Sequence, residues 1–177
     1  MNNSKKLLIP FIATLVGALL IVLTLFLPYA SATDETRQGL AMMSSMTVSE
    51  DGGITAGDLI DISLVELASI CIKTDSLANE EDAMIFIILI AIISVFAILT
   101  VVFAIFKKPI AVIIFDILTL IVYFIFGIGK ETVGIGEMYD LGAAYYIFFV
   151  AVIITFVAAI WLLITKKQIK KAAQFAA

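Results

Sequence analysis

The sequence predicts an all-α integral membrane protein, a single domain in which four transmembrane helices form one bundle. Of its 177 residues, 63% are hydrophobic, and the mean hydropathy is +1.17. A soluble domain cannot bury so large a share of apolar side chains. The chain also holds apolar runs of about 20 residues, the length that crosses the hydrocarbon core as a helix. None of these runs alternates polar and apolar residues as a transmembrane β-strand does, and only helices and closed barrels pair their backbone groups in lipid.

The first predicted span covers residues 7–28. Lys5 and Lys6 precede it, and Pro28 and Tyr29 are typical of the end of a span at the membrane interface. The tripeptide ASA that follows resembles the cleavage site of a secretory signal, but the apolar run is longer than the roughly 7–15 residues of a signal core. We therefore expect a retained transmembrane helix.

A large outer loop is predicted over residues 30–82. Its first part, DETRQGLAMMSSMTVSEDGG, is polar and rich in small residues, which is typical of a loop, and a short strand around Val48 is the alternative. The second part has apolar residues at helical spacing with charged residues opposite them. We expect an amphipathic helix there over about 58–73, capped by Thr55 or Asp58. Its apolar face consists of Ile60, Leu64, Leu67 and Cys71.

This apolar face is a candidate surface for a partner. It can pack on the outer end of the bundle, lie on the outer leaflet, or dock into the groove of another protein. The polar face carries Asp58, Asp61 and Glu66, which disfavours contact with anionic lipid. Packing on the bundle and docking of a partner are therefore the main alternatives.

The second and third spans are predicted over 83–106 and 109–126. The KKP turn between them is so short that the two helices must be adjacent and antiparallel, and Pro109 is favourable in the first turn of a helix. The remaining segments are a small outer loop over 127–140, the fourth span over 141–165 and a lysine-rich tail over 166–177.

Basic residues gather on one side of the predicted membrane. Of the 11 Lys and Arg residues, all but Arg37, Lys73 and Lys130 lie beside the termini or in the KKP turn. All but one of the 15 acidic residues lie in the outer loops or at their ends. Since cationic loops stay in the cytoplasm, we expect a multi-pass protein of the cell membrane with both termini cytoplasmic. The lysines on this side are Lys5, Lys6, Lys107, Lys108, Lys166, Lys167, Lys170 and Lys171.

One acidic residue, Asp116, lies inside a predicted span. Asp116, Thr119 and Tyr123 are spaced i, i+3 and i+7, so they share one face of the third helix. At a rise of 1.5 Å per residue, Thr14 and Thr100 lie about as deep as Asp116, roughly 9–11 Å from the inner ends of their helices. These five residues form the candidate intramembrane polar site.

Three roles for Asp116 are open. A charged Asp at mid-helix costs about 2.5–3.5 kcal/mol, so its carboxyl must be hydrogen-bonded, protonated, hydrated or matched by a cation. It can bond hydroxyls or freed backbone groups of neighbouring helices, meet a cation or donor on a partner helix, or titrate in a small carrier. No Lys or Arg lies within the spans, so an intrachain salt bridge requires Lys107 or Lys108 to extend inward.

Several classes of function are disfavoured. There is no histidine, and Cys71 is the one cysteine, so neither an internal disulfide nor a Cys/His zinc site is expected. The spans hold no second carboxylate to share acid–base work with Asp116, and no phosphate- or dinucleotide-binding motif is present. We therefore expect no enzymatic activity, catalytic residue, cofactor, metal or nucleic-acid partner.

The leading hypothesis is a membrane accessory, scaffold or assembly subunit that acts through helix packing and its outer loop. Its expected partners are the lipid bilayer and either another membrane protein or a second copy of the chain. The alternative is a small proton- or cation-coupled transporter or channel subunit that uses the carboxylate of Asp116.

Overall fold

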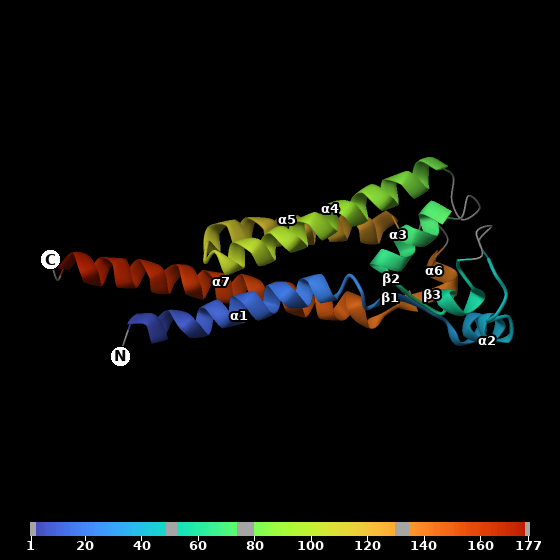
Figure 1. Cartoon of the computed structure of the whole chain (residues 1–177), viewed down its shortest axis with the longest axis horizontal. Coiled ribbons are helices and arrows are strands. Elements are labelled where there is room, and N and C mark those ends of the chain that lie inside the picture. Colours follow the sequence, from blue (N-terminus) through green and yellow to red (C-terminus); the bar gives the residue numbers. More distant parts are fainter. Residues whose placement is uncertain (1–2, 49–52, 74–79, 130–134, 176–177) are drawn as a thin grey trace.

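The computed structural model describes residues 3–48, 53–73, 80–129 and 135–175. Long helices dominate it (Figure 1). Four of these helices contain apolar stretches long enough to cross a membrane, as the sequence predicts. They are α1 (Asn3–Leu23), α4 (Glu80–Ile105), α5 (Pro109–Gly129) and α7 (Ala143–Phe175).

Each long helix packs against two others. Helices α1 and α5 each contact α4 and α7, and each runs antiparallel to both of them. Figure 1 shows both chain termini at one end of the bundle, called here the terminal end, and the short elements at the other, called here the sheet end. The two termini therefore lie on the same side, as an even number of crossings requires.

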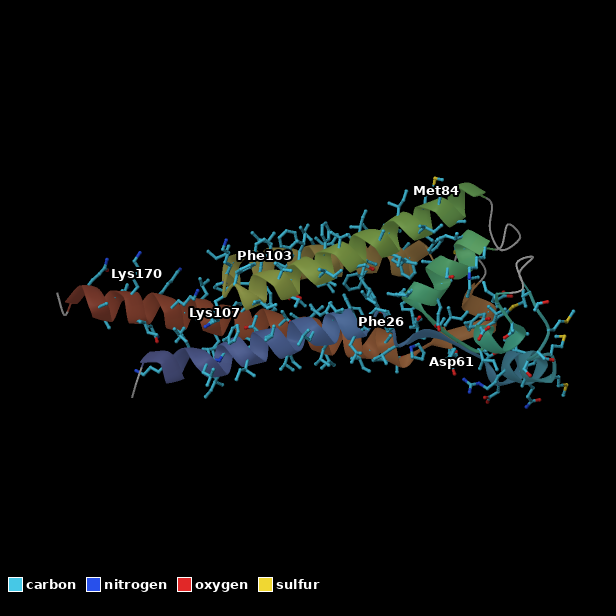
Figure 2. All side chains as sticks on the ribbon, viewed as in Figure 1. Phe26, Asp61, Met84, Phe103, Lys107 and Lys170 are labelled. Atoms are coloured by element: carbon cyan, nitrogen blue, oxygen red, sulfur yellow. The ribbon has the colours of Figure 1, made fainter. Side chains whose placement is uncertain are left out.

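The buried residues of α4 and α5 recur at intervals of three and four, which keeps one stripe of each helix against its neighbours. The outward stripes carry large apolar side chains such as Ile114, Ile121 and Phe124, a pattern favourable in contact with hydrocarbon. Figure 2 shows mostly hydrocarbon side chains along the long helices and more nitrogen and oxygen at the two ends. The inward stripes are Phe86, Ile90, Ile93, Ala97, Thr100 and Ala104 on α4, and Val112, Asp116, Thr119, Tyr123 and Phe126 on α5.

A three-stranded antiparallel sheet lies at the sheet end, so the prediction of an all-α fold was wrong in this part. The central strand β1 (Pro28–Ala32) pairs with β2 (Asp61–Ser63) on one side and with β3 (Tyr139–Leu141) on the other. Strands this short leave no recognisable alternation in the sequence. Because β2 and β3 come from different outer loops, the sheet joins both loops to the end of α1.

The first span is shorter as a helix than the predicted 7–28. Helix α1 ends at Leu23, and a turn leads into β1. Pro28 has no N–H to donate, and its ring disfavours the helical conformation in the residue before it. The Thr24 hydroxyl donates to the Ile21 carbonyl at 2.6 Å, which satisfies one acceptor where the helix ends.

The outer part of the first loop is more regular than predicted. Helix α2 (Asp34–Met42) occupies a segment expected to be loop, and its first turn carries Asp34 and Glu35, which favour a helix N-terminus. Around Val48 the alternative strand is reduced to an isolated bridge between Thr47 and Thr55. Arg37 of α2 pairs with Asp61 of β2 at 3.1 Å, in an exposed position.

The amphipathic helix predicted over 58–73 is divided into η1 (Ala56–Leu59), β2 and α3 (Leu64–Lys73). Two capping boxes set these boundaries. The backbone N–H and the hydroxyl of Thr55 both donate to the Asp58 carboxylate at 2.8 Å. The Ser63 N–H donates to the Glu66 carboxylate at 2.9 Å, and the Glu66 N–H donates to the Ser63 hydroxyl at 3.2 Å. This second box starts α3, and its S-x-x-E pattern was present in the sequence.

The second loop and the tail also differ from the predicted segments. Helix α5 continues to Gly129, past the predicted end at 126, and the predicted loop contains α6 (Ile135–Met138) and β3. Helix α7 begins at Ala143 and continues through most of the predicted tail to Phe175. Gly142 separates β3 from α7 and donates its N–H to the Tyr29 carbonyl at 2.7 Å. A Cβ at Gly142 would collide with the Pro28 carbonyl, so the close approach of the two segments requires glycine.

Candidate functional site

Asp116 lies in the bundle interior, in the inward stripe of α5. Its side chain is 0% exposed, and neither carboxylate oxygen has a hydrogen-bond partner among the described residues. An unpartnered buried acceptor of this kind destabilises a protein by roughly 1–3 kcal/mol. Burying the carboxyl in this way is therefore unfavourable for folding.

The threonine hydroxyls that were expected to bond Asp116 donate to backbone carbonyls of their own helices instead. Thr119 donates to the Phe115 carbonyl at 2.7 Å, one turn earlier in its own helix. The other threonines in the interior make the same bond within their helices, a local alternative that is always within reach of a helical threonine. These bonds run from Thr14 to Pro10 at 2.7 Å, from Thr100 to Phe96 at 2.9 Å and from Thr155 to Ala151 at 2.8 Å. The structure thus buries all the predicted threonines but pairs none of their hydroxyl groups with Asp116.

A layer of small apolar residues lies next to the Asp116 level of the bundle. It takes one residue from each of α4, α5 and α7 and consists of Ala104, Val112 and Ala159, called here the apolar layer. Ala18 of α1 belongs to the same cluster, but it lies farther toward the sheet end, because its neighbour Gly17 packs on Thr155. Asp116 and Thr100 each lie one helical turn from their layer residue toward the sheet end. Thr119 and Tyr123 lie farther along α5 in the same direction. Thr14 lies about one turn from Gly17, and so from Thr155, toward the terminal end. It is therefore at the level of the apolar layer and not of the Asp116 group.

Thr155 of α7 belongs to the Asp116 group, although it was not among the predicted site residues. It lies one turn from the apolar layer toward the sheet end and is fully buried. Gly17 of α1 packs on the backbone of Thr155 so closely that a Cβ would collide with the threonine. The small-xxx-small spacing of α1 and α7 was the sequence signal for this close contact.

A cavity of about 280 Å³ lies between α5 and α7, beside Asp116. Apart from Asp116, its lining is entirely apolar. Ile117 is 41% exposed and Ile153 is 63% exposed, so the mouth of the cavity opens on the outward surface of the bundle. The lining residues are Asp116, Ile117, Leu120, Val152, Ile153 and Phe156.

Tyr123 lies in an aromatic cluster near the sheet end. Its ring stacks on Phe148 at a centroid distance of 3.7 Å, and the rings of Tyr29 and Tyr145 lie 5.9 and 6.1 Å away. The hydroxyls of Tyr29 and Tyr123 are buried and have no hydrogen-bond partner among the described residues. Burial raises the pKa of Tyr29 to about 12, and the nearby phenol of Tyr145 adds to this shift. Sequence reasoning placed Tyr29 only at the interface, because β1 and its position over the bundle were not predicted.

The predicted partner face in the first loop is largely occupied by the protein itself. Leu64 is 0% exposed, and Leu67 packs against the main core, since α3 lies on α4. Ile70 is buried in a smaller cluster beneath the sheet, whereas Cys71 is half-buried and burial raises the pKa of its thiol. Ile60 precedes α3 and lies outside its apolar face. This packing favours the alternative in which the apolar face covers the end of the bundle.

Within the described residues there is no group of three or more His, Cys, Asp and Glu side chains able to hold a metal ion. Comparisons with protein-family models, with curated proteins and with solved structures gave no match.

Proposed function

We propose that this chain is a non-enzymatic membrane accessory or assembly subunit that acts through helix packing and its folded outer layer. The observation that supports this most is the unpartnered carboxyl of Asp116 beside a cavity that opens outward between α5 and α7. The proposed occupant is a transmembrane helix of a partner that brings a cationic or hydrogen-bond-donating side chain to Asp116. Charge complementarity favours this partner, because no Lys or Arg lies within the four spans predicted from the sequence.

The proposed setting is the cell membrane, with both termini in the cytoplasm. The lysines of the α4–α5 turn and of the end of α7 support this orientation, because they lie at the terminal end of the bundle (Figure 2). The sheet and the acidic outer elements then face the exterior.

The test is to fill the cavity and follow a co-purifying membrane protein. Ile153→Trp places a larger side chain in the cavity, whereas Ile164→Trp makes the same change on the outward face of α7 away from it. We expect a partner that is captured in mild detergent and identified by mass spectrometry to be lost with Ile153→Trp and with Asp116→Leu, and to be retained with Ile164→Trp. Equal capture by all three variants would contradict the proposed contact.

A second candidate is a small proton- or cation-coupled transporter or channel subunit in which Asp116 titrates. The observation that favours it is the complete burial of a carboxyl without a counter-ion among the described residues. Asp116→Asn separates the two functions, because an amide still forms hydrogen bonds but cannot exchange a proton. Flux in reconstituted vesicles should then be lost while partner capture survives, and preserved flux would rule out this candidate.

A further inference from the structure

Three unpartnered polar side chains follow one another from the sheet end into the bundle. The hydroxyls of Tyr29 and Tyr123 and the carboxylate of Asp116 are all buried and have no hydrogen-bond partner within the described segments. Buried polar groups in native proteins are nearly always paired, and ordered water pairs those that protein groups do not reach. Three such groups, one after another toward the bundle interior, therefore indicate that water molecules pair with them.

Two of these groups, Asp116 and Tyr123, lie on the inward stripe of α5, and Tyr29 of β1 packs on Tyr123; with Thr119 these residues are called here the seam. Tyr123 and Asp116 are seven residues apart, a separation of about 10 Å along the helix. Side chains in a helix lean toward its N-terminus, so the phenol of Tyr123 is directed toward Thr119 and Asp116. Thr119 is fully buried between them, and its hydroxyl oxygen can still accept a hydrogen bond while it donates to Phe115.

At the sheet end, the aromatic cluster beside the seam includes a partly exposed residue. Tyr145 of α7 is half-buried, and its ring lies 6.4 Å from Tyr29 and 6.1 Å from Tyr123. In the other direction the apolar layer lies one turn beyond Asp116, and the hydroxyl of Thr14 at that level donates to the Pro10 carbonyl of its own helix. Among the described residues, unpartnered buried polar side chains thus continue from Asp116 toward the sheet end and not toward the terminal end.

No other ionisable group faces Asp116 from the helices around it. Tyr123 is the neighbour on its own helix, and α4 has no ionisable residue between Met84 and the lysines of the α4–α5 turn. Helix α1 has none beyond Lys6, and α7 has none between Tyr146 and Lys166. Any protonation change in this part of the bundle therefore belongs to Asp116.

We propose that Asp116 exchanges its proton with the aqueous phase at the sheet end only, through water held along the seam of Tyr29, Tyr123 and Thr119. In uptake, a hydronium ion at the sheet end gives its proton to the first water of the seam. Successive transfers between waters and hydroxyls neutralise the carboxylate, and one water molecule is left at the surface. Release follows the same path in reverse. This inference rests on the second candidate function only in requiring that Asp116 titrates.

The test is infrared spectroscopy of the full chain in vesicles whose protein orientation has been determined. The carbonyl band of protonated Asp116 is identified by its absence in Asp116→Asn, or by its displacement in Asp116→Glu where the amide variant does not fold. With the pH buffered on one side and stepped on the other, we expect the band to follow the pH at the sheet end and to ignore the pH at the terminal end.

The variants Tyr123→Phe and Thr119→Val remove seam hydroxyls, and we expect each to slow the band response by about tenfold or more without moving its midpoint. Tyr146→Phe makes the matched change on a 62% exposed tyrosine outside the seam and should respond like the unmodified chain. A response to both sides, or an unchanged rate in both seam variants, would overturn the sided path while a titrating Asp116 remained. A band that never responds would overturn the second candidate function as well.

Discussion

Asp116 is a residue whose surroundings oppose its charge. A carboxylate at the middle of a transmembrane helix costs about 2.5–3.5 kcal/mol on insertion scales, and an unmade hydrogen bond adds to that cost. In the bundle the carboxyl has apolar residues on one side and threonines with satisfied donors on the other. Such a group is retained where function requires it, since an apolar side chain of similar size is more favourable for folding alone.

The first prediction concerns this residue. Asp116→Leu should raise the free energy of unfolding of the isolated chain by about 1–3 kcal/mol, because it removes an unpartnered buried carboxyl at nearly constant volume. Asp116→Asn should give a smaller change, since the amide still leaves polar groups in the same place. Denaturant unfolding of the purified protein in detergent measures both. A clear loss of stability with leucine would indicate that the carboxyl has a strong partner in the folded state.

The second prediction concerns the pH dependence contributed by Tyr29. Its folded-state pKa is raised to about 12 by burial, so its contribution to stability is complete below the unfolded pKa of about 10 and is lost as the pH rises through about 12. Tyr29→Phe should therefore weaken the fall in stability over this window. At neutral pH it should leave stability unchanged or raise it, because the buried hydroxyl has no partner among the described residues.

Unfolding followed as a function of pH makes this measurement, with Tyr146→Phe as the control for loss of an exposed phenol. A slope over pH 10–12 that is the same in Tyr29→Phe and in the unmodified chain would contradict the burial of an unpaired phenol at this position.

The polar positions were predictable at this scale, but their bonding was not. The spacing of Asp116, Thr119 and Tyr123 was enough to place them on one buried face. Their partners depend on the competition between contacts across helices and bonds within a helix, and no sequence pattern reports its outcome. Tyr29 joins the same group only because a strand follows α1, so its role required the three-dimensional structure.

At the scale of elements, contacts between helices depend on where the backbones can approach. Helices α1 and α7 meet where Gly17 faces Thr155. In lipid, close packing of this kind replaces much of the hydrophobic driving force that holds soluble helices together. The contact also fixes the level of Thr155 relative to Asp116, so it bears on the site as well as on stability.

The third prediction follows from this contact. Gly17→Ala should reduce the free energy of unfolding by about 1–3 kcal/mol, because the added Cβ collides with the backbone of Thr155 and must push α1 away from α7. Gly127→Ala is the matched control in α5, where no atom lies within 4 Å of the added Cβ. The control should be neutral or should gain up to about 1 kcal/mol from helix propensity. Equal effects of the two substitutions would mean that α1 and α7 are farther apart than described.

The long helices were predictable as elements, and the short ones were not. An apolar run of membrane length has few alternatives in lipid, so the four spans were recognisable, although α1 ends at Leu23 rather than at 28 and α7 continues past 165 to Phe175. The segment 58–73 has one apolar period, but one capping box lies at its start and a second lies inside it, and the local bonds of Thr55 and Ser63 divided it. Strands β2 and β3 depend on pairing with β1 across long stretches of chain, which local patterns do not report.

At the scale of the whole molecule, the two ends of the bundle differ in charge and in secondary structure. Lysines without acidic neighbours occupy the terminal end, and the sheet with its acidic helices occupies the other (Figure 2). The sheet links the end of α1 to the start of α7, so the two outer loops fold as one layer rather than as independent connections. Because β1 brings Tyr29 into the aromatic cluster, the folding of the outer loops also bears on the proposed water path to Asp116.

The last prediction tests the orientation on which both proposed functions depend. In a Cys71→Ala background, Met42→Cys places a thiol at an 87% exposed position of α2, and Lys170→Cys places one on the terminal extension of α7. If the lysine-rich end is cytoplasmic, a membrane-impermeant maleimide should label the first variant in intact cells and the second only after the membrane is permeabilised. The opposite pattern would invert the topology and place the seam of Asp116 in contact with the cytoplasm. Labelling of both variants in intact cells would show that the two ends are not separated by a membrane.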